Sequence, residues 1–167
     1  MMYTTVKFAK TKPTAIIPTK RDEDAGYDIY ANFDEDYIVI PPHKTVMIPT
    51  GIACACDIDY CFIIKERGST GTKGMAQRCG VIDSGYRDEI LVPITNTTDK
   101  KIYIKKKDKT IPVLDNISDS ILYPYEKAIA QLLLVPVPMA EPEEYTYEEL
   151  KAIPSKRGIG AWGSSGK

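Results

Sequence analysis

The feature that most limits the fold of this chain is its division into short apolar runs separated by turn residues. Twelve prolines among 167 residues suit strand edges and turns, not long helices. Short β-rich runs at this spacing predict an all-β sandwich or barrel in a single domain. The runs are YIVI (37–40), TVMIP (45–49), IACAC (52–56), YCFIIK (60–65), VID (81–83), EILVPIT (89–95), KIYIKK (101–106) and AIAQLLLVPV (128–137).

Only two segments have a helical character, so we expect at most one or two short helices. SDSILY (118–123) follows a Ser that can cap a helix, and EPEEYTYEELKAI (141–153) begins with Pro142 and acidic residues and has Lys151 near its end. The basic run KKIYIKKKDK (100–109) alternates charged with apolar residues, which predicts a solvated strand face.

Composition limits the partners that the chain can have. The net charge is −1, which gives no sign of nucleic-acid or membrane binding. No run of about 18 apolar residues is present, and the N-terminus lacks the apolar core of a signal peptide, so we expect a cytoplasmic protein. Cys54, Cys56 and Cys61 fit none of the usual zinc spacings and are interpreted as small buried side chains.

Two polar stretches follow apolar strands and have the composition of binding loops. KERGSTGTKG (65–74) offers backbone N–H groups, hydroxyls and Arg67 to an oxyanion, although a plain surface loop has the same composition. CGVIDSGYRDEI (79–90) puts Val81 and Ile82, which favour burial, directly before Asp83 and a Ser-Gly turn. Asp83 is therefore either a general base for water or a turn Asp that bonds its own backbone.

Three further positions bear on the chemistry. The only histidine, His43, lies in a predicted exposed turn, so Ser–His and Cys–His catalysis are nearly excluded and phosphoanhydride chemistry is the natural candidate. Asp28 lies among apolar neighbours, where it can hold a metal-bound water, bind a sugar hydroxyl or form a turn. Gln131 interrupts an apolar strand and needs a partner, either backbone or a ligand phosphate.

Five blocks in this order resemble the trimeric dUTP pyrophosphatase (dUTPase) family. They are AGYD (25–28), RGST (67–70), GVIDSGYRDE (80–89), IAQL (129–132) and RGIGAWGSSG (157–166). The resemblance implies a jelly-roll-like, distorted all-β barrel that forms a homotrimer with shared active sites. It also implies Mg²⁺-assisted hydrolysis of dUTP to dUMP and pyrophosphate, which lowers dUTP and feeds dTMP synthesis.

The resemblance also implies roles for individual residues. Asp83 resembles the base that activates the attacking water, and Tyr86 the ring that packs beneath deoxyribose and excludes a 2′-hydroxyl. Gly80 and Leu91 lie where the family offers backbone groups to uracil. Asp28 matches the carboxylate near the waters of Mg²⁺, which is held mainly by the substrate phosphates. The remaining substrate-binding positions are Arg67, Gly68, Ser69, Val81, Gln131, Arg157, Trp162, Gly163, Ser164 and Ser165.

The chain departs from the family pattern at several of these blocks. Gly68 stands where the family has Ser, so Ser69 is the candidate for that hydroxyl. Trp162 replaces a Phe that stacks on uracil, Asp88 and Ala161 each replace Gly, and Lys127-Ala128 replace an acid–base pair. We expect one domain over 1–156 with an insertion at about 99–124 and a glycine-rich lid at 157–167, and a possible protein partner at 100–125.

Two other functions remain open from the residues. The related dCTP deaminases share the fold, but they need an acid/base Glu that no motif here supplies. A non-catalytic trimer that keeps the nucleotide site is also compatible with the sequence.

Overall fold

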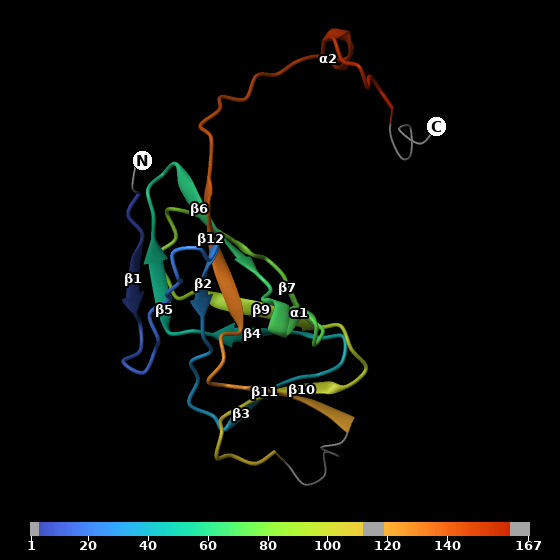
Figure 1. Cartoon of the computed structure of the whole chain (residues 1–167). Helices are drawn as coiled ribbons and strands as arrows, with labels where there is room; N and C mark the ends of the chain where they lie inside the picture. The colour runs from blue at the N-terminus through green and yellow to red at the C-terminus, as the bar shows by residue number, and fades with distance from the viewer. Residues whose placement is uncertain (1–3, 112–118, 161–167) are drawn as a thin grey trace. The chain divides into compact units, whose positions relative to one another are not determined.

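The computed structural model describes residues 4–111 and 119–160, and the regular secondary structure within these ranges is mostly β-strand (Figure 1). This confirms the all-β prediction and the limit of two short helices. The first strands are β1 (Lys7–Lys10), β2 (Gly26–Ile29), β3 (Tyr37–Ile40), β4 (Thr45–Pro49), β5 (Ile52–Ala55) and β6 (Tyr60–Lys65). The later elements are α1 (Gly68–Gly71), β7 (Met75–Gln77), β8 (Val81–Ile82), β9 (Leu91–Asn96), β10 (Lys101–Lys105), β11 (Ser120–Pro124), β12 (Ala130–Pro136) and α2 (Tyr147–Ala152).

The strands form four small sheets that are linked by crossovers. In order across each sheet they are β1-β5, β11-β10-β3, β2-β12-β6-β8 and β4-β9-β7. Every pairing is antiparallel except that of β10 with β11, which is parallel. Each of these sheets is small and open, with one edge strand on either side.

Strand β12 brings distant parts of the chain together. It pairs with β2 on one side and β6 on the other, so Gln131 lies opposite Asp28 and also opposite Lys65 (Figure 1). Strand β8 adds to the far edge of β6, where Ile63 pairs with Val81. Asp28 and Gln131 therefore lie on neighbouring strands of one sheet, while Arg67 and Asp83 lie just beyond the ends of β6 and β8.

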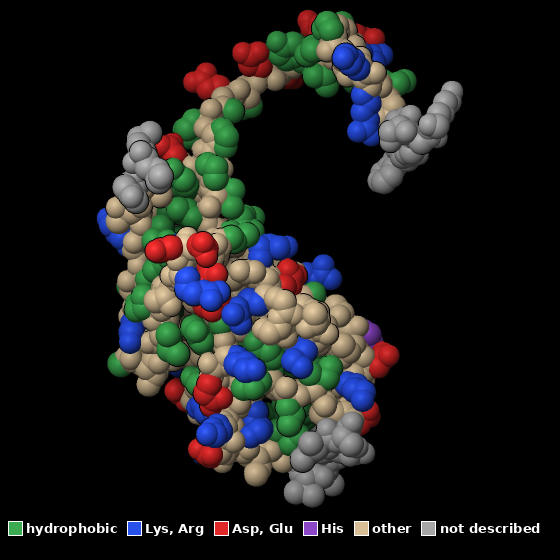
Figure 2. All heavy atoms as spheres, viewed as in Figure 1, with side chains coloured by type: hydrophobic (Ala, Val, Ile, Leu, Met, Phe, Trp, Pro, Cys, Tyr) green, Lys and Arg blue, Asp and Glu red, His purple; other side chains and the backbone are tan. Residues whose placement is uncertain are grey.

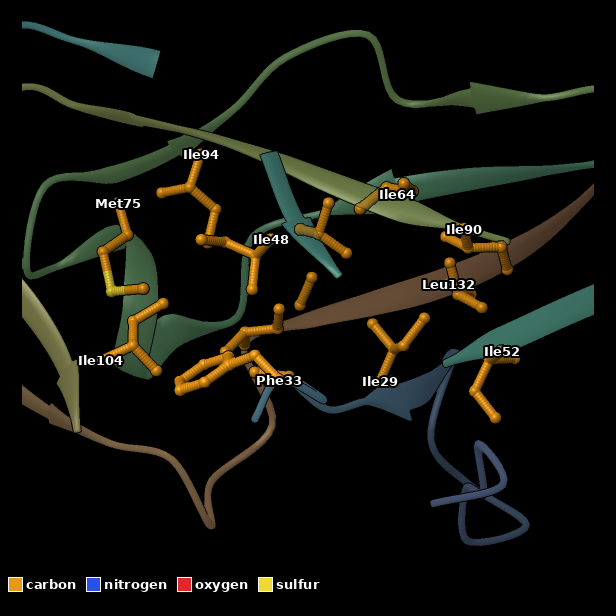
Figure 3. Packing of buried hydrophobic residues seen from close by; sticks show 14 of the residues in the cluster. Ile29, Phe33, Ile48, Ile52, Ile64, Met75, Ile90, Ile94, Ile104 and Leu132 are labelled. Atoms are coloured by element: carbon orange, nitrogen blue, oxygen red, sulfur yellow. The ribbon is translucent and has the colours of Figure 1, made fainter. Parts of the chain in front are cut away.

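The core beneath this sheet is built mainly from isoleucine. Ile29, Ile48, Ile94 and Leu132, from four different strands, have no exposed surface and pack together (Figure 3). Branched side chains suit the pleated strand surface and lose little entropy when they are buried there. Each apolar run therefore needs only the few residues that span this one common core.

Both predicted helical segments differ from the expectation. Residues 118–123 were expected to be helical, but Ser120–Pro124 form β11, because Ile121 and Tyr123 pack against the core and the strand pairs with β10. The second helix begins at Tyr147, six residues later than expected. There Thr146 caps the Glu149 backbone N–H at 3.2 Å and Glu149 Oε2 accepts the Thr146 N–H at 2.9 Å.

The basic run at 100–109 has exposed charged residues at both ends but a buried middle, so the prediction of a solvated strand face is only partly correct. Ile102, Tyr103 and Ile104 are all buried, because β10 is the central strand of its sheet. The lysines that follow are held by local partners: Lys106 lies over the rings of Phe33 and Tyr125, at 5.5 and 5.4 Å. Figure 2 shows cationic and anionic side chains interspersed on the visible face of the globular part.

The chain divides into two compact units, Met1–Val137 and Pro138–Lys167. The first holds every strand, and the second holds α2. Part of the predicted insertion, residues 112–118, lies outside the described residues, as does most of the predicted lid. In the part of the chain that the structure describes, no helix is long and apolar enough to cross a membrane.

Candidate active site

A bidentate ion pair joins the first two polar blocks. Arg67 Nε lies 2.8 Å from Asp28 Oδ1, and Arg67 Nη2 donates to Asp28 Oδ2 at 3.2 Å. Gln131 lies beside this pair and donates from Nε2 to the backbone oxygen of Glu66 at 2.7 Å. The prediction that Gln131 pairs with backbone is therefore correct for its amide N–H₂ group. Its Oε1 accepts no hydrogen bond from the described residues.

The loop that carries Arg67 closes into one helical turn, α1, although its residues have no helical pattern. Thr70 is fully buried and holds the turn, because its Oγ1 accepts the Arg67 N–H at 3.0 Å and donates to the Arg67 oxygen at 3.1 Å. Around Gly68 there is open space, since an added Cβ would meet no atom within 4 Å. Gly68 is thus not required by packing, and Ser69 supplies the hydroxyl of this part of the loop.

These residues line a polar hollow of about 780 Å³. Its walls are Thr19, Lys20, Arg21, Glu23, Asp24, Ala25, Gly26, Asp28, Arg67, Gly68, Ser69 and Gln131. At its outer edge Arg21 and Asp24 form an ion pair at 2.8 Å; their hydrogen bond raises the pKa of Arg21 and lowers the pKa of Asp24. The hollow thus holds three cations and three carboxylates with hydroxyls and an amide, so its donors suit ligand oxygens and its carboxylates suit a ligand that brings a cation.

The carboxylate of Asp83 is exposed at the tight turn after β8. Tyr86 N–H closes the turn on the Asp83 main-chain oxygen at 3.1 Å, and Arg87 donates to the Ser84 and Tyr86 oxygens. Within residues 4–111 and 119–160 the Asp83 carboxylate itself accepts no hydrogen bond. The alternative in which this side chain caps its own turn is therefore not what the fold uses.

Beside Asp83 is a second, apolar pocket of about 210 Å³. Its lining is Met47, Ile64, Cys79, Val81, Ile82, Asp83, Tyr86, Ile90, Leu91 and Pro93. Val81 was expected to be buried, but 64% of it is exposed, because Ile82 takes the core-facing position and its strand neighbour must face the other way. Val81 and Leu91 thus offer exposed apolar surface at the rim, as a flat ligand ring requires.

The backbone before this pocket is unusually close to its neighbour strand. Gly80 accepts the Ile64 N–H at 2.7 Å, and a Cβ on Gly80 would lie 2.7 Å from the Ile64 oxygen. The preceding Cys79 has a positive φ of 47°. Only glycine fits at position 80, which fixes the approach of the chain to Asp83.

Glu89 is a structural residue of the site that the sequence analysis missed. Its Oε1 accepts the N–H groups of Thr50 and Gly51 at 3.0 and 2.8 Å, and its main-chain oxygen accepts the Tyr86 hydroxyl at 3.0 Å. Glu89 therefore ties the turn after β4 to the loop that carries Tyr86. Its place at the end of the GVIDSGYRDE block was the only available signal.

The predicted site residues fall into two separate groups within one chain. Asp28, Arg67, Gly68, Ser69 and Gln131 line the polar hollow, whereas Val81, Asp83, Tyr86 and Leu91 line the apolar pocket, next to Gly80. Arg157 lies in the second unit and donates from Nε to the Gly160 oxygen at 2.8 Å. Trp162, Gly163, Ser164 and Ser165, with Ala161, lie outside the described residues.

The cysteines form no disulfide and no metal cluster in the described parts of the chain. Cys54 and Cys61 are buried, as expected, but Cys56 is half-buried and Cys79 is exposed at the apolar pocket. His43 is exposed in a turn, as predicted, with its Nε2 2.9 Å from Asp99.

Comparison with known proteins decides the family. The family model for dUTPase matches residues 12–113. A deoxyuridine 5'-triphosphate nucleotidohydrolase of Debaryomyces hansenii is 33% identical over 155 residues, which cover 92% of this chain and 82% of that protein. This chain belongs to the dUTPase family. Another such protein, from Nautilia profundicola, is 31% identical over 166 residues and is matched over 99% of its length.

Solved dUTPase structures have the same fold. The dUTPase of Staphylococcus bacteriophage 80alpha, a G164S mutant with dUpNHpp, superposes with a TM-score of 0.74 at 25% identity over 98% of this chain and 99% of that one. The EIAV dUTPase superposes with a TM-score of 0.63 at 23% identity, over 86% and 98%. The predicted jelly-roll-like dUTPase fold is therefore confirmed.

Proposed function

We propose that this chain hydrolyses dUTP to dUMP and pyrophosphate, with Asp83 as the base that directs water onto the α-phosphorus. Membership of the dUTPase family supports the overall reaction. The role of Asp83 is supported by its carboxylate, which is exposed at a rigid turn and uncommitted to any described partner. A base must have its lone pairs available to a water, and this is the state of Asp83.

The triphosphate binds, on this proposal, in the polar hollow. The Arg67 guanidinium reaches phosphate oxygens, and the side chains of Ser69 and Gln131 line the hollow beside it. Arg67 keeps donor positions for a phosphate even while it pairs with Asp28, because a guanidinium has five N–H groups. Charge neutralisation by such groups is the main protein contribution to phosphoryl chemistry.

The nucleoside binds in the apolar pocket. The Tyr86 ring lies against deoxyribose, and the rim residues Val81 and Leu91 flank the base. The backbone of Gly80 and Leu91 reads the uracil edge, because backbone groups can pair with a flat polar edge without a side chain between them. Tyr86 is held for this task by its hydrogen bond to the Glu89 oxygen.

A homotrimer with shared sites explains why one chain splits the site in two. The polar hollow and the apolar pocket have no lining residue in common. One dUTP molecule would use both if a neighbouring subunit placed its apolar pocket next to this chain's polar hollow. The tail completes the site: Arg157, Gly163, Ser164 and Ser165 grip the γ-phosphate, and Trp162 stacks on uracil.

The residues present fit Mg²⁺ that is held mainly by substrate. No cluster of three or more His, Cys, Asp or Glu in the described residues could hold a metal by itself, and Asp28 is the carboxylate of the polar hollow nearest Arg67. Asp28 would act through bound waters, because Mg²⁺ dehydrates reluctantly. When bound, Mg²⁺ would neutralise charge on the triphosphate.

A substrate panel tests the proposal. Pyrophosphate release is measured from dUTP, dTTP, dCTP and UTP, each with Mg²⁺ and with EDTA, and ammonia release is measured from dCTP. We expect rapid turnover only of dUTP, and only with Mg²⁺. Equal turnover of UTP would contradict the role of Tyr86, and release of ammonia from dCTP would favour a deaminase instead.

A further inference from the structure

We propose that Tyr123 is a positioning residue for the phosphate loop, and that it acts through the hydroxyl of Ser69. This inference rests on the proposed function, since Ser69 matters only if the polar hollow binds phosphate. Tyr123 belongs to β11 and is only 1% exposed. Its hydroxyl oxygen lies 3.4 Å from Ser69 Oγ and 2.6 Å from the main-chain oxygen of Ala128.

The chemistry of these groups fixes the direction of each hydrogen bond. The Ala128 oxygen can only accept, so the single proton of the Tyr123 hydroxyl is used there. Tyr123 Oη can then only accept from Ser69, and the Ser69 proton points toward Tyr123. Arg67 can only donate, so its Nη1, 3.4 Å from Ser69 Oγ, donates to one of the two lone pairs of that oxygen.

The result is a directed series of donors from Arg67 through Ser69 and Tyr123 to Ala128. Arg67 is thereby held from two sides, by Asp28 through an ion pair and by Ser69 through this series. The Ser69 hydroxyl shows the polar hollow its lone-pair side, not its proton. Its main effect is therefore on the position of Arg67, and Tyr123 sets that position from the core.

Local sequence makes the loop depend on this anchor. Gly68 has no side chain and open space around it, so it restrains the turn only through its main-chain oxygen, which accepts from Thr72. Thr70 fixes the backbone end of the turn, but its hydrogen bonds reach only the Arg67 main chain. Tyr123 is the buried group that restrains the Ser69 side chain, because β11 pairs with the buried strand β10 and cannot shift easily.

A double-mutant cycle tests this inference. Tyr123→Phe and Ser69→Ala are prepared singly and together, and kcat/KM for dUTP and the free energy of unfolding in urea are measured for each. We expect each single change to lower kcat/KM by up to about tenfold, which is the upper end for loss of one hydrogen bond between uncharged groups. The kcat/KM of the double variant should be no lower than that of the less active single variant, because both changes remove the same Tyr123–Ser69 hydrogen bond.

Tyr125→Phe is the matched control. Tyr125 lies two residues further on, packs its ring on Phe33 at 4.9 Å, and does not line the polar hollow. The Tyr125→Phe variant should lose some stability but keep its kcat/KM. If loosening of this segment alone lowered the activity, kcat/KM would also fall in this variant. Rescue by Ser69→Thr, which keeps the hydroxyl, should restore at least part of the rate lost in Ser69→Ala.

The outcomes separate the inference from the proposed function. If the unchanged protein hydrolyses dUTP but the two changes multiply to about a hundredfold loss, Tyr123 does not act through Ser69 and the inference is wrong. If the unchanged protein does not hydrolyse dUTP, the proposed function is wrong. In that case the free energies of unfolding of the three variants still test whether Tyr123 and Ser69 interact. Additive losses of stability would refute the interaction, and coupled losses would support it.

Discussion

Arg67 and Asp28 meet as a two-point ion pair although they are 39 residues apart, with Nε–Oδ1 at 2.8 Å and Nη2–Oδ2 at 3.2 Å. They meet because β12 pairs with β2 on one side and β6 on the other. Each side chain is 32% exposed, so one face of the pair is open to the polar hollow. The pair thus sets the direction of the guanidinium that the proposed function assigns to phosphate.

Arg67→Lys should lower kcat/KM for dUTP by about 10- to 100-fold. Lysine has the charge but not the planar fork, so it cannot keep Asp28 and reach a phosphate at the same time. The check is steady-state kinetics with dUTP and Mg²⁺. Arg78→Lys is the matched control, because Arg78 donates to Thr95 Oγ1 at an exposed position and lines neither pocket. A rate loss of equal size in the control would refute the assignment.

Gly80→Ala should destabilise the fold by roughly 1–3 kcal/mol and reduce activity. The added methyl would lie 2.7 Å from the Ile64 main-chain oxygen, which cannot move without breaking the β6–β8 pairing. Urea unfolding measures the effect. Gly85→Ala is the comparison, since its Cβ would meet no atom within 4 Å and its stability should change by less than about 0.5 kcal/mol. Equal losses in the two variants would contradict the steric argument.

Much of the fold was predictable because the apolar runs obey strand rules locally. The runs at 37–40, 45–49 and 60–65 match β3, β4 and β6 residue for residue. Strand β11 was not predictable, because its sequence has a helix-cap signal and only pairing with β10 overrides it. Strand β2 was missed since its Gly and Asp are poor strand formers that β12 holds in place.

Alkaline pH should destabilise the protein through Cys54. Burial raises the pKa of this thiol to about 11 from an ordinary 9.0. Between these values the unfolded chain releases the proton and the native protein keeps it, so stability is complete below pH 9 and falls by about 1.4 kcal/mol per pH unit above it.

Cys54→Val isolates this contribution, because valine fits a buried strand position and does not titrate. Urea unfolding in the presence of a reductant is compared at pH 8 and pH 10.5 for both proteins. The unchanged protein should lose about 1–2 kcal/mol more than the variant over this range. The same loss in both would mean that Cys54 ionises normally in the native state.

Removal of residues 157–167 should strongly lower activity and leave the globular unit folded. The proposed tail contacts supply a charge-assisted grip and a stacking ring worth about 1–3 kcal/mol, and every strand within the described residues lies before this segment. Kinetics with dUTP and thermal unfolding of the truncated protein check the two halves of this statement. Unchanged kinetics would refute the lid.

The site was only partly predictable from sequence, for a physical reason. Motif positions identify residue types, so Arg67, Asp28 and Asp83 were found. They do not show which way a side chain points, and Val81 therefore faces solvent where burial was expected. The directed hydrogen bonds of Tyr123 and the anchoring role of Glu89 depend on contacts between segments 38 or more residues apart, which no local pattern encodes.

Asp83→Asn tests the proposed mechanism most directly. Asparagine has the shape of aspartate but cannot take a proton from water, and Asp83 makes no described side-chain contact that the change would break. Initial rates of pyrophosphate release from dUTP with Mg²⁺ are measured together with the affinity for a non-hydrolysable dUTP analogue. We predict a fall in kcat of about 10²- to 10⁴-fold with nearly unchanged affinity. Release of pyrophosphate near the unchanged protein's rate would contradict the assignment of Asp83 as the base.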